Sequence, residues 1–273
     1  MLLGIDIGGT TISLGLVDDY KIVKKVCVPS FEKNATLNET IDYLIARIEE
    51  VITPDVDSIG VGVPTLVDSI DGVVFDAANI PSWTEVPLKA ILEKRFGVRT
   101  VVNNDANCYA LGAASKLEEK YPVVVGVTLG TGIGVGVVSD GKLLCGTNCG
   151  VGEVGAIPYM GKDYESFCSS KFFADKGCTG GDAAKAVAAG DKEAMALFEE
   201  FGRHLGAFLA VVMFAYDPGC IIIGGGLSRS FDLFSGSMME ALRAAYPYTR
   251  SLDRLKIVPM HQDENALLGA SLM

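Results

Sequence analysis

The 273-residue sequence predicts an α/β protein that contains one structural unit twice. In the first copy, a short apolar strand over residues 2–7 leads through a Gly-Gly-Thr-Thr turn into a second apolar strand over 12–17. In the second copy, a strand over 123–129 leads through a Gly-Thr-Gly turn into a strand over 135–138. An Asp-containing turn and a third strand follow in both copies. A unit repeated in this order indicates an internally duplicated fold with two domains.

The composition narrows the class of protein. The formal net charge is −11, which argues against nucleic acid as a partner, because that binding depends on positive charges that release counterions. No apolar run approaches the roughly 20 residues that a membrane-spanning helix needs. The stretch from Met1 to Asp6 lacks a basic region, so we expect no signal peptide. A protein that binds neither nucleic acid nor membrane is therefore expected.

The cysteines and histidines indicate the redox state of the cellular compartment and the kinds of metal site that the chain can form. Seven cysteines, an odd number, lie in apolar and loop contexts and indicate reduced thiols in a cytoplasmic protein. His204 and His261 are the only histidines, which excludes a site with many histidine ligands. Helical spacing places His204 among apolar residues and favours a core or rim position, whereas His261 follows a strand and has no obvious partner.

Local signals define the remaining elements of the first domain. Thr36 and Glu39 form a possible capping box, and apolar residues then recur at helical spacing until Pro54. Gly97 is expected to end a second helix. The elements expected after the first hairpin are, in order, strands 21–28, 58–63 and 73–75 and helices 37–52 and 88–96.

The stretch from Val101 to Asn107 has two β-branched residues, then polar residues, then an alanine-rich run to about residue 117. This pattern predicts the end of a buried strand with a helix directly after it. Open α/β sheets bind ligands at the carboxyl ends of their strands, so Asn104 and Asp105 are candidate functional residues. The alternative is that Asn and Asp only cap the helix, as they often do.

The domain boundary is expected near residue 118, giving domains over 1–118 and 119–273. No low-complexity linker separates them, which favours two domains packed around a central cleft. Residues 149–170 are expected to be rich in loops. The terminal helix is expected to pack on the N-terminal domain. The later elements expected are strand 142–144, a long helix from 192 to the stop at Asp217-Pro218, strand 220–223, helix 231–245, strand 255–258 and helix 264–273.

The two Gly-Thr turns are candidate phosphate sites. Neither fits the P-loop or the dinucleotide-binding fingerprint, because both of those require a helix after the glycines. A glycine hairpin between strands can still present backbone N–H groups to an anion. An ordinary hairpin explains either turn alone. Their repetition in matching surroundings favours an ATP-binding fold.

Six segments, in this order, resemble motifs of the ROK (repressor, open reading frame, kinase) family of sugar kinases. That family has the duplicated ribonuclease H-like fold of actin- and hexokinase-type ATPases. The segments are Gly4-Ile5-Asp6-Ile7-Gly8-Gly9-Thr10-Thr11, the loop with Asn79, Asn103-Asn104-Asp105-Ala106-Asn107, Leu129-Gly130-Thr131-Gly132-Ile133-Gly134, Gly152-Glu153-Val154-Gly155 and Gly224-Gly225-Gly226. The resemblance covers essentially the whole chain and implies a cytoplasmic, glucokinase-like enzyme that forms a homodimer.

The resemblance also implies roles for individual residues. Asp105 is implied as the general base, and Asp6 as an outer-shell anchor for Mg²⁺. Sugar hydroxyls are implied to bind Asn79, Asn104, Asp105, Glu153 and Glu165. ATP is implied to bind Gly8, Gly9, Thr10, Thr11, Gly130, Thr131, Gly132, Gly224, Gly225 and Gly226.

Two departures from the family pattern concern the segment before Glu165. The family usually has a histidine, which also contacts the sugar, where this sequence has Ala156. The cysteine cluster that binds structural zinc with this histidine is missing from residues 157–164. Cys168 and Cys178 have the wrong spacing for a zinc clip, so no zinc is expected.

The leading hypothesis is an ATP- and Mg²⁺-dependent kinase that phosphorylates a hexose, by default the 6-hydroxyl of glucose or a close relative. Alternatives within the same class are kinases for N-acetylmannosamine, N-acetylglucosamine or fructose. Alternatives of another class are a non-catalytic sugar sensor of the ROK type and an ATPase that activates a partner. The first phosphate motif begins at Leu2, where a sensor would carry a helix-turn-helix.

Overall fold

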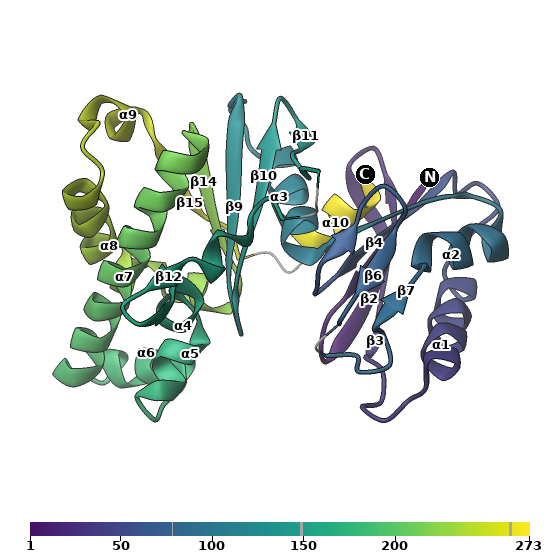
Figure 1. The fold of residues 1–273 in the computed structure, drawn as a ribbon, viewed down its shortest axis with the longest axis horizontal. Helices are drawn as coiled ribbons and strands as arrows, with labels where there is room; N and C mark the ends of the chain where they lie inside the picture. Colours follow the sequence, from purple (N-terminus) through teal and green to yellow (C-terminus); the bar gives the residue numbers. More distant parts are fainter. Residues whose placement is uncertain (78, 148–149, 262–263) are drawn as a thin grey trace. The chain divides into compact units, whose positions relative to one another are not determined.

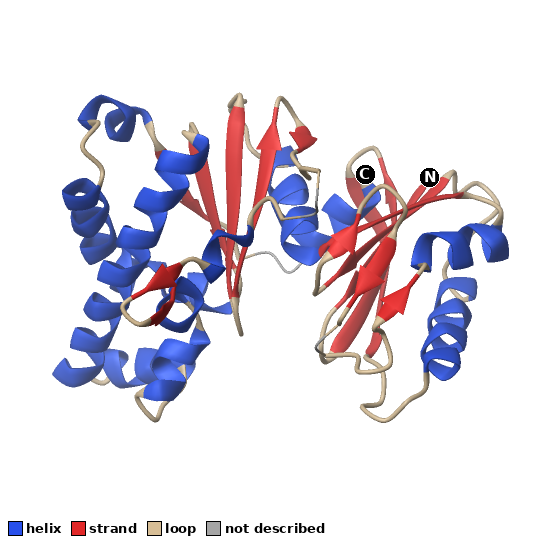
Figure 2. Ribbon diagram, viewed as in Figure 1, coloured by secondary structure: helices blue, strands red, loops and turns tan. Residues whose placement is uncertain are grey.

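The computed structural model describes residues 1–77, 79–147, 150–261 and 264–273. It divides into two compact units, and both combine a β-sheet with helices (Figure 1, Figure 2). The first unit comprises Met1–Glu118, Gly141–Val151 and Asp263–Met273, and the second comprises Glu119–Asp140 and Gly152–Gln262. The predicted α/β class is confirmed. The cleft between two domains stays a prediction.

The first unit is built on a mixed sheet with the strand order β3-β2-β1-β4-β8. The first three strands form an antiparallel meander, and β4 and β8 then run parallel to β1. Its elements are β1 (Leu2–Ile7), β2 (Thr11–Asp18), β3 (Lys21–Pro29), α1 (Leu37–Glu49), β4 (Ser58–Val63), β5 (Val67–Asp68), β6 (Val73–Phe75), β7 (Glu85–Val86), α2 (Leu88–Phe96), β8 (Arg99–Asn104), α3 (Asp105–Ser115), β11 (Lys142–Leu143) and α10 (Asn265–Ser271).

The second unit contains the strands β10-β9-β14-β15 in that order. Helices α7 and α8 pack against each other beside this sheet (Figure 1). The elements are β9 (Val123–Leu129), β10 (Ile133–Ser139), η1 (Glu153–Ala156), β12 (Pro158–Tyr159), β13 (Lys162–Asp163), α4 (Tyr164–Cys168), α5 (Ser170–Asp175), α6 (Gly180–Ala188), α7 (Lys192–Tyr216), β14 (Cys220–Gly224), η2 (Gly226–Ser230), α8 (Phe231–Ala245), α9 (Thr249–Arg254) and β15 (Lys256–Pro259).

The two sheets repeat one arrangement. In the first, β1 pairs antiparallel with β2 and parallel with β4, which pairs parallel with β8. In the second, β9 pairs antiparallel with β10 and parallel with β14, which pairs parallel with β15. The duplication predicted from the Gly-Thr turns is therefore confirmed. Each sheet has three parallel strands whose carboxyl ends share one edge.

The predicted helix ends form as their residues require. Thr36 caps α1 through a capping box with Glu39, whose carboxylate accepts the Thr36 backbone N–H at 2.8 Å. Gly97 ends α2 in the left-handed conformation, with φ of 71°. Asp217 ends α7 in the same conformation, directly before Pro218. The Thr36 side chain and the backbone N–H groups of Gly97 and Asp217 thus pair with backbone groups that a helix end leaves open.

The terminal helix α10 packs on β1, β4 and α3 within the first unit. The approach is close enough that glycines are needed beneath it. A Cβ at Gly60 of β4 would lie 1.6 Å from the carbonyl oxygen of Ala270. A Cβ at Gly269 of α10 would lie 1.7 Å from the carbonyl oxygen of Cys108 in α3. The last residues of the chain thus form part of the core that supports the first sheet.

The segment expected to be rich in loops has more structure than predicted. Within 149–170 lie η1, the β12–β13 hairpin and α4, and α5 and α6 follow. These elements are two to nine residues long, which is too short for a repeating pattern of apolar residues to be recognised in the sequence. Six cysteines have free thiols, and Cys149 lies outside the described residues. No helix in the described part of the chain is long and apolar enough to span a membrane.

Candidate active site

Polar residues of the first unit gather where β1, β4 and β8 end. Asp6 of β1 lies opposite Gly62 of β4, and Gly62 lies opposite Asn103 of β8. β8 ends at Asn104, and α3 begins at Asp105. Because the three strands are parallel, the first glycine hairpin and Asp105 lie at one edge of the sheet. This edge is where open α/β sheets bind ligands.

The charges of Asp6 and Asp105 both act on the thiol of Cys108 in α3. Burial is the main cause that raises the pKa of Cys108 well above its usual range, and the two carboxylates raise it further. A Cβ at Gly62, which lies opposite Asp6, would be 3.2 Å from the Cys108 sulfur and 3.7 Å from Cα of Asp105, so these residues lie close together. Cys108 is therefore a protonated, buried thiol rather than a nucleophile.

Asn104 caps α3. Its side-chain oxygen accepts the backbone N–H groups of Ala106, at 2.9 Å, and Asn107, at 3.3 Å. Its amide donates to the carbonyl oxygen of Thr65 at 3.1 Å, which uses one of the two amide hydrogens. The capping alternative considered for this stretch thus applies to Asn104. Asp105 is the first residue of the helix, and its carboxylate accepts the Ala106 N–H at 2.8 Å.

Asn103 holds the strand–helix junction from the buried side, a role that the sequence did not indicate. Its side-chain oxygen accepts from the backbone N–H of Asn104 and the side-chain amide of Asn107, both at 2.9 Å. Its own amide donates to the sulfur of Cys145 at 3.4 Å. The Asn103–Asn107 spacing of four residues around a helix start is the signal that could have shown this pair.

Asp6 is a partly buried carboxylate on β1. Burial raises the pKa of Asp6 to about 6, and the charge of Lys25 opposes that rise. A carboxylate held in such surroundings gains from a nearby cation. Asp6 alone suits Mg²⁺ bound through water, because Mg²⁺ keeps most of its waters in proteins. Among the described residues, no group of three or more His, Cys, Asp or Glu side chains could hold a metal directly.

The first glycine hairpin is tied to the end of β3. The N–H of Gly8 donates to the carbonyl oxygen of Thr11 at 2.9 Å, and the hydroxyl of Ser30 donates to the carbonyl oxygen of Gly8 at 2.8 Å. The side chain of Asn79 lies against the turn, because a Cβ at Gly9 would be 3.3 Å from its amide nitrogen. Gly9 and Asn79, two predicted site residues, therefore lie together, and Ser30, which the sequence did not reveal, supports the turn.

The loop that carries Asn79 is anchored in the core by the only tryptophan. The backbone N–H of Ala77 donates to the carbonyl oxygen of Trp83 at 2.9 Å and closes the loop. The buried Trp83 indole donates to the hydroxyl of Thr40 at 2.8 Å. This anchor limits how far Asn79 can move relative to the hairpin.

The second glycine hairpin lies between β9 and β10 and has a shorter loop than the first. Leu129 pairs with Ile133 across it, whereas Ile7 pairs with Ile12 in the first unit. The N–H of Gly130 donates to the carbonyl oxygen of Gly132 at 3.0 Å. Thr131 at its tip is exposed and Gly132 half-buried. Exposed backbone and hydroxyl donors of this kind suit a phosphate.

The triple-glycine segment lies against the strand that leads into the second hairpin. Gly224 of β14 lies opposite Thr128 of β9. Gly225 has φ of 77° and ψ of 176°, a conformation that essentially only glycine adopts. A Cβ at Gly225 would also lie 2.4 Å from the carbonyl oxygen of Leu129. The structure thus brings two of the predicted ATP-binding segments together within the second unit.

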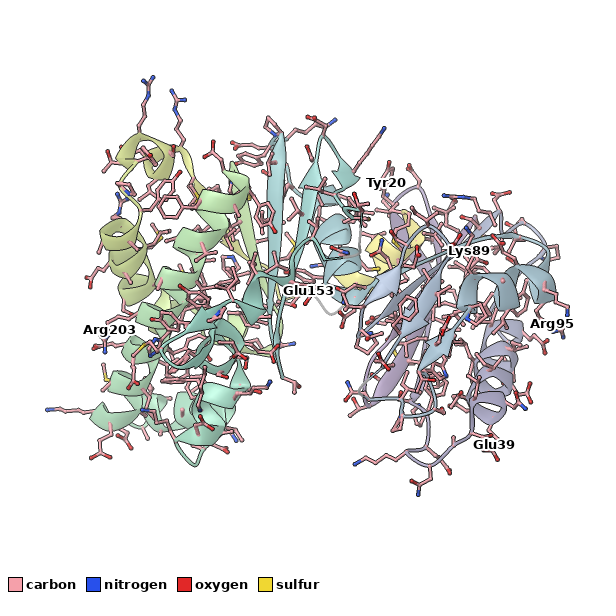
Figure 3. The ribbon with its side chains drawn as sticks, viewed as in Figure 1. Tyr20, Glu39, Lys89, Arg95, Glu153 and Arg203 are labelled. Atoms are coloured by element: carbon pink, nitrogen blue, oxygen red, sulfur yellow. The ribbon has the colours of Figure 1, made fainter. Side chains whose placement is uncertain are left out.

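Glu153 begins η1 directly after a glycine that has no room for a side chain. Gly152 has φ of 96°, and a Cβ there would lie 2.0 Å from the carbonyl oxygen of Val135 in β10. The turn presses on β10 and leaves the Glu153 side chain exposed at the surface of the unit (Figure 3). Although it is exposed, the Glu153 carboxylate is shielded from part of the surrounding water, and this shielding, followed by the charge of Glu165, raises its pKa.

Glu165, on α4, contacts the second hairpin. One carboxylate oxygen accepts the backbone N–H of Ile133 at 3.3 Å, and the other pairs with the ammonium of Lys171. A Cβ at Gly132 would lie 2.4 Å from the Glu165 carboxylate. Glu165 thus lies between the predicted sugar-binding and phosphate-binding segments of this unit. Lys171 was not predicted, because nothing in the sequence shows that it faces Glu165.

Aromatic residues hold the segment in which the family histidine and cysteines are missing. The ring of Tyr159 stacks on that of Tyr164, with centroids 4.2 Å apart, and its hydroxyl bonds to Nδ1 of His204 at 3.1 Å. His204 therefore lies at the rim of a cluster, as the sequence suggested. His261, which lacked a partner in sequence, bonds through Nδ1 to the hydroxyl of Ser228 at 3.0 Å.

The comparisons with known proteins agree on one family. The chain matches the model of the ROK family over residues 2–273. The N-acetyl-D-glucosamine kinase of Erwinia tasmaniensis is 30% identical over 306 residues, which cover 100% of this chain and 99% of that protein.

Two solved structures are similar over nearly their whole length. A ROK family glucokinase from Streptomyces griseus, in complex with glucose and AMPPNP, has a TM-score of 0.81, 26% identity and coverage of 99% of this chain and 97% of its own. The ROK hexokinase from Thermus thermophilus has a TM-score of 0.83, 27% identity and coverage of 99% and 96%. The resemblance seen in the motifs is confirmed, and the chain belongs to the ROK family.

Proposed function

We propose that this protein is an ATP-dependent sugar kinase in which Asp105 is the general base. The observation that carries the proposal is the shared strand edge of the first unit. There Asp6 lies near the end of β1, the glycine hairpin follows β1, and Asp105 follows β8, which runs parallel to β1 and is joined to it through β4. Membership of the ROK family and relatives named as kinases of glucose and N-acetyl-D-glucosamine support it.

The proposed reaction is an in-line phosphoryl transfer. A sugar hydroxyl oxygen forms a bond to the γ-phosphorus, the bond to the β–γ bridging oxygen breaks, and ADP leaves. The hydroxyl proton passes to the carboxylate of Asp105. A general base of this kind contributes about 10²–10⁴-fold to the rate. The Asn104 cap fixes the start of α3 and with it the position of Asp105.

The nucleotide would bind to backbone groups of the three glycine segments. We assign Gly8, Gly9, Thr10 and Thr11 and the second hairpin, residues 130–132, to the phosphates, and residues 224–226 to the adenosine. We assign Asp6 to Mg²⁺ through water. When bound, Mg²⁺ neutralises phosphate charge, which is most of what this reaction requires beside positioning.

The sugar would bind through four side chains besides Asp105. We assign Asn79, Asn104, Glu153 and Glu165 to its hydroxyls, since a glutamate can accept from two hydroxyls at once. Asn104 keeps one amide hydrogen for this role after its contact with Thr65. The family usually has a sugar-contacting histidine where this chain has Ala156, so this set has one sugar ligand fewer.

Glucose or a close relative is the proposed substrate, phosphorylated at the 6-hydroxyl. N-acetyl-D-glucosamine is the second candidate, because the Erwinia tasmaniensis kinase named for it is 30% identical along the whole chain. The two sugars differ at carbon 2, so the residues near that carbon decide between them. The 6-hydroxyl chemistry is the same for both.

A coupled assay for ADP formation tests the proposal. Purified protein with ATP and Mg²⁺ is offered glucose, mannose, fructose, N-acetyl-D-glucosamine and N-acetylmannosamine in separate reactions. We expect at least one sugar to increase ADP formation well above the rate without sugar. If no hexose or N-acetylhexosamine does so, the protein is not a sugar kinase, and a sensor or partner-activating ATPase becomes the better hypothesis.

A further inference from the structure

Lys171 places a positive charge beside the second phosphate hairpin. Its ammonium pairs with one carboxylate oxygen of Glu165. The other oxygen of the same carboxylate accepts the backbone N–H of Ile133, the residue that follows the hairpin, at 3.3 Å. Lys171 thus contacts Glu165, and Glu165 contacts the end of the hairpin. All three belong to the second unit.

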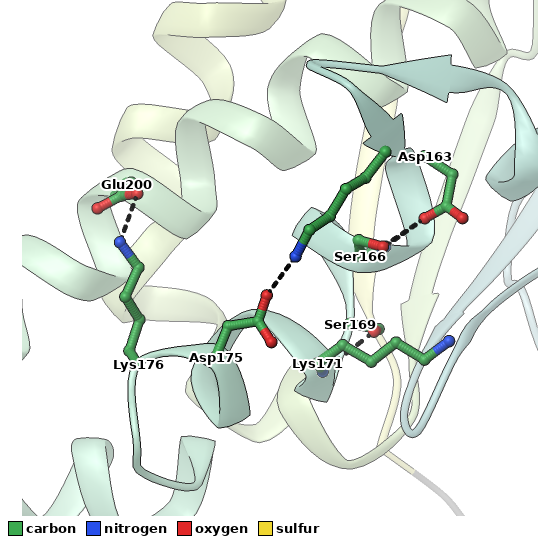
Figure 4. A network of polar contacts seen from close by, with 8 residues as sticks. Asp163, Ser166, Ser169, Lys171, Asp175, Lys176 and Glu200 are labelled. Atoms are coloured by element: carbon green, nitrogen blue, oxygen red, sulfur yellow. Dashed lines mark hydrogen bonds and ion pairs between the residues drawn. The ribbon is translucent and has the colours of Figure 1, made fainter.

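The backbone at Lys171 is held close to the hairpin. The N–H of Ser170 donates to the carbonyl oxygen of Gly130 at 2.9 Å. The hydroxyl of the buried Ser169 accepts the N–H of Lys171 at 3.2 Å (Figure 4). These bonds hold the backbone of Lys171 in place. Its flexible four-carbon side chain still allows the ammonium to change partners.

The Lys171–Glu165 pair is weak enough to exchange. The exposed fraction is 50% for the Lys171 side chain and 33% for Glu165, so water competes with the pair. A phosphate group carries more negative charge than a carboxylate and offers three acceptor oxygens. A phosphate bound to the hairpin would therefore compete well for the ammonium.

The neighbouring lysines serve other partners. Lys162 pairs with Asp175 at 2.6 Å, and Lys176 pairs with Glu200 at 3.1 Å. The ammonium of Lys171 points away from both of those pairs (Figure 4). Lys171 differs from them because its partner also contacts the phosphate hairpin.

We propose that Lys171 is a phosphate-binding residue that exchanges partners during the reaction. With nucleotide bound, its ammonium leaves Glu165 and binds the phosphate at the second hairpin, where it offsets the charge of the transferred group. Glu165 is then free of its counter-ion and accepts hydrogen bonds from the sugar. This inference rests on the proposed function, and it makes nucleotide and sugar binding cooperative.

The test compares Lys171→Gln with Lys171→Arg and with Lys176→Gln as a matched control. Lys176 is a lysine of the same unit that also pairs with a glutamate, away from the hairpin. The readouts are kcat, the KM for ATP and for sugar, and the sugar Kd measured with and without the non-hydrolysable analogue AMPPNP. Thermal unfolding checks that each variant is folded.

We expect Lys171→Gln to lower kcat by about 10²–10³-fold, as loss of a group that stabilises a transition state does. The analogue should tighten sugar binding in the unchanged protein and no longer do so in Lys171→Gln. Lys171→Arg should keep most of kcat, and Lys176→Gln should behave as the unchanged protein.

The proposal is overturned if Lys171→Gln keeps kcat within twofold and the analogue still tightens sugar binding. It is also overturned if Lys171→Arg is as impaired as Lys171→Gln, because charge would then not be the property that matters. These outcomes are separate from a failure of the kinase proposal, which shows as the absence of sugar-dependent ADP formation in the unchanged protein.

Discussion

At the scale of single residues, the site holds carboxylates where burial opposes their charge. Burial raises the pKa of Asp6 to about 6, and it raises the pKa of Glu153 as well. Asp6 lies on a strand of the first sheet, between apolar residues that form the core. A carboxylate kept in such a place costs stability, which makes Asp6 a candidate for binding a cation.

The loss of stability caused by burying Asp6 can be measured through the pH dependence of the free energy of unfolding. Below about pH 3.8 the side chain is protonated in both states and has no effect on the free energy of unfolding. Between pH 3.8 and about 6 the unfolded chain ionises first, so this free energy falls as the pH rises. Above pH 6 the loss is constant, on the order of 3 kcal/mol.

We therefore expect Asp6→Asn to be more stable than the unchanged protein at pH 7.5, by roughly 1–3 kcal/mol. The difference should shrink at pH 4, where the aspartate of the folded protein holds its proton. Urea unfolding of both proteins at the two pH values measures this. A difference that is the same at both pH values, or an Asn variant that is less stable at pH 7.5, would contradict the account.

The candidate residues at the strand end could be recognised in the sequence, but the separate role of each could not. The polar run from Asn103 to Asp105 indicated either a cap or a functional site; the structure shows the cap, and the functional role of Asp105 stays a prediction. Asn104 caps the helix, and Asp105 follows as its first residue. The Asn104 side chain is held in its direction by the carbonyl oxygen of Thr65, a contact that no local pattern reveals.

At the scale of elements, the glycine turns are held by their neighbours rather than by their own sequence. The first is bonded to Ser30 at the end of β3, and the second to Ser170 at the start of α5. The triple-glycine segment follows β14 and presses on the end of β9. Each turn therefore has a fixed shape before a ligand arrives, which lowers the cost of binding.

Two glycines of the last segment give a matched test of that fixed shape. A Cβ at Gly225 would lie 2.4 Å from the Leu129 carbonyl oxygen, whereas a Cβ at Gly226 would meet nothing within 4 Å. Gly225→Ala should destabilise the protein by at least about 1–3 kcal/mol, because it adds backbone strain to that clash. Gly226→Ala should cost clearly less.

Chemical denaturation of the two alanine variants measures the difference in the free energy of unfolding. The KM for ATP of Gly225→Ala should also rise if the segment backs the adenosine. Equal stability of the two variants would show that the backbone near Leu129 yields easily and that the turn is not pre-formed.

Long helices were predicted well, whereas the short helices between residues 153 and 188 were not. Helix α8 spans Phe231–Ala245, the range expected from its hydrophobic spacing, and α7 ends at the expected Asp217-Pro218 stop. Helices α4 and α5, of five and six residues, complete less than two turns and show no period. The Glu165–Lys171 pair joins these two short helices, so it could not be found before the structure.

At the scale of the whole molecule, one duplicated arrangement accounts for most of the predicted site. Each sheet has a glycine hairpin followed by parallel strands that end at one edge. In the first unit, Asp6 lies on β1 and Asp105 begins α3 directly after β8. In the second unit, the two glycine segments follow β9 and end β14, and the two glutamates lie on η1 and α4. The repeat was visible in sequence because both copies keep their Gly-Thr turns.

The choice of sugar is a different matter, because the fold does not decide it. Relatives that share this fold along the whole chain are named for glucose and for N-acetyl-D-glucosamine. We propose that the choice of sugar depends on side chains near the site, with Glu153, Glu165 and Ala156 as the first to test. The reaction, by contrast, should depend on Asp105 whichever sugar is bound.

The turnover and sugar affinity of Asp105→Asn test whether Asp105 is the general base. The substitution keeps the shape of the side chain and removes its ability to take a proton. We expect kcat to fall by about 10²–10⁴-fold, while the sugar Kd, measured by titration, changes by only a few fold. If Asp105→Asn instead retains most of its kcat, Asp105 is not the base, and the account of this site is wrong.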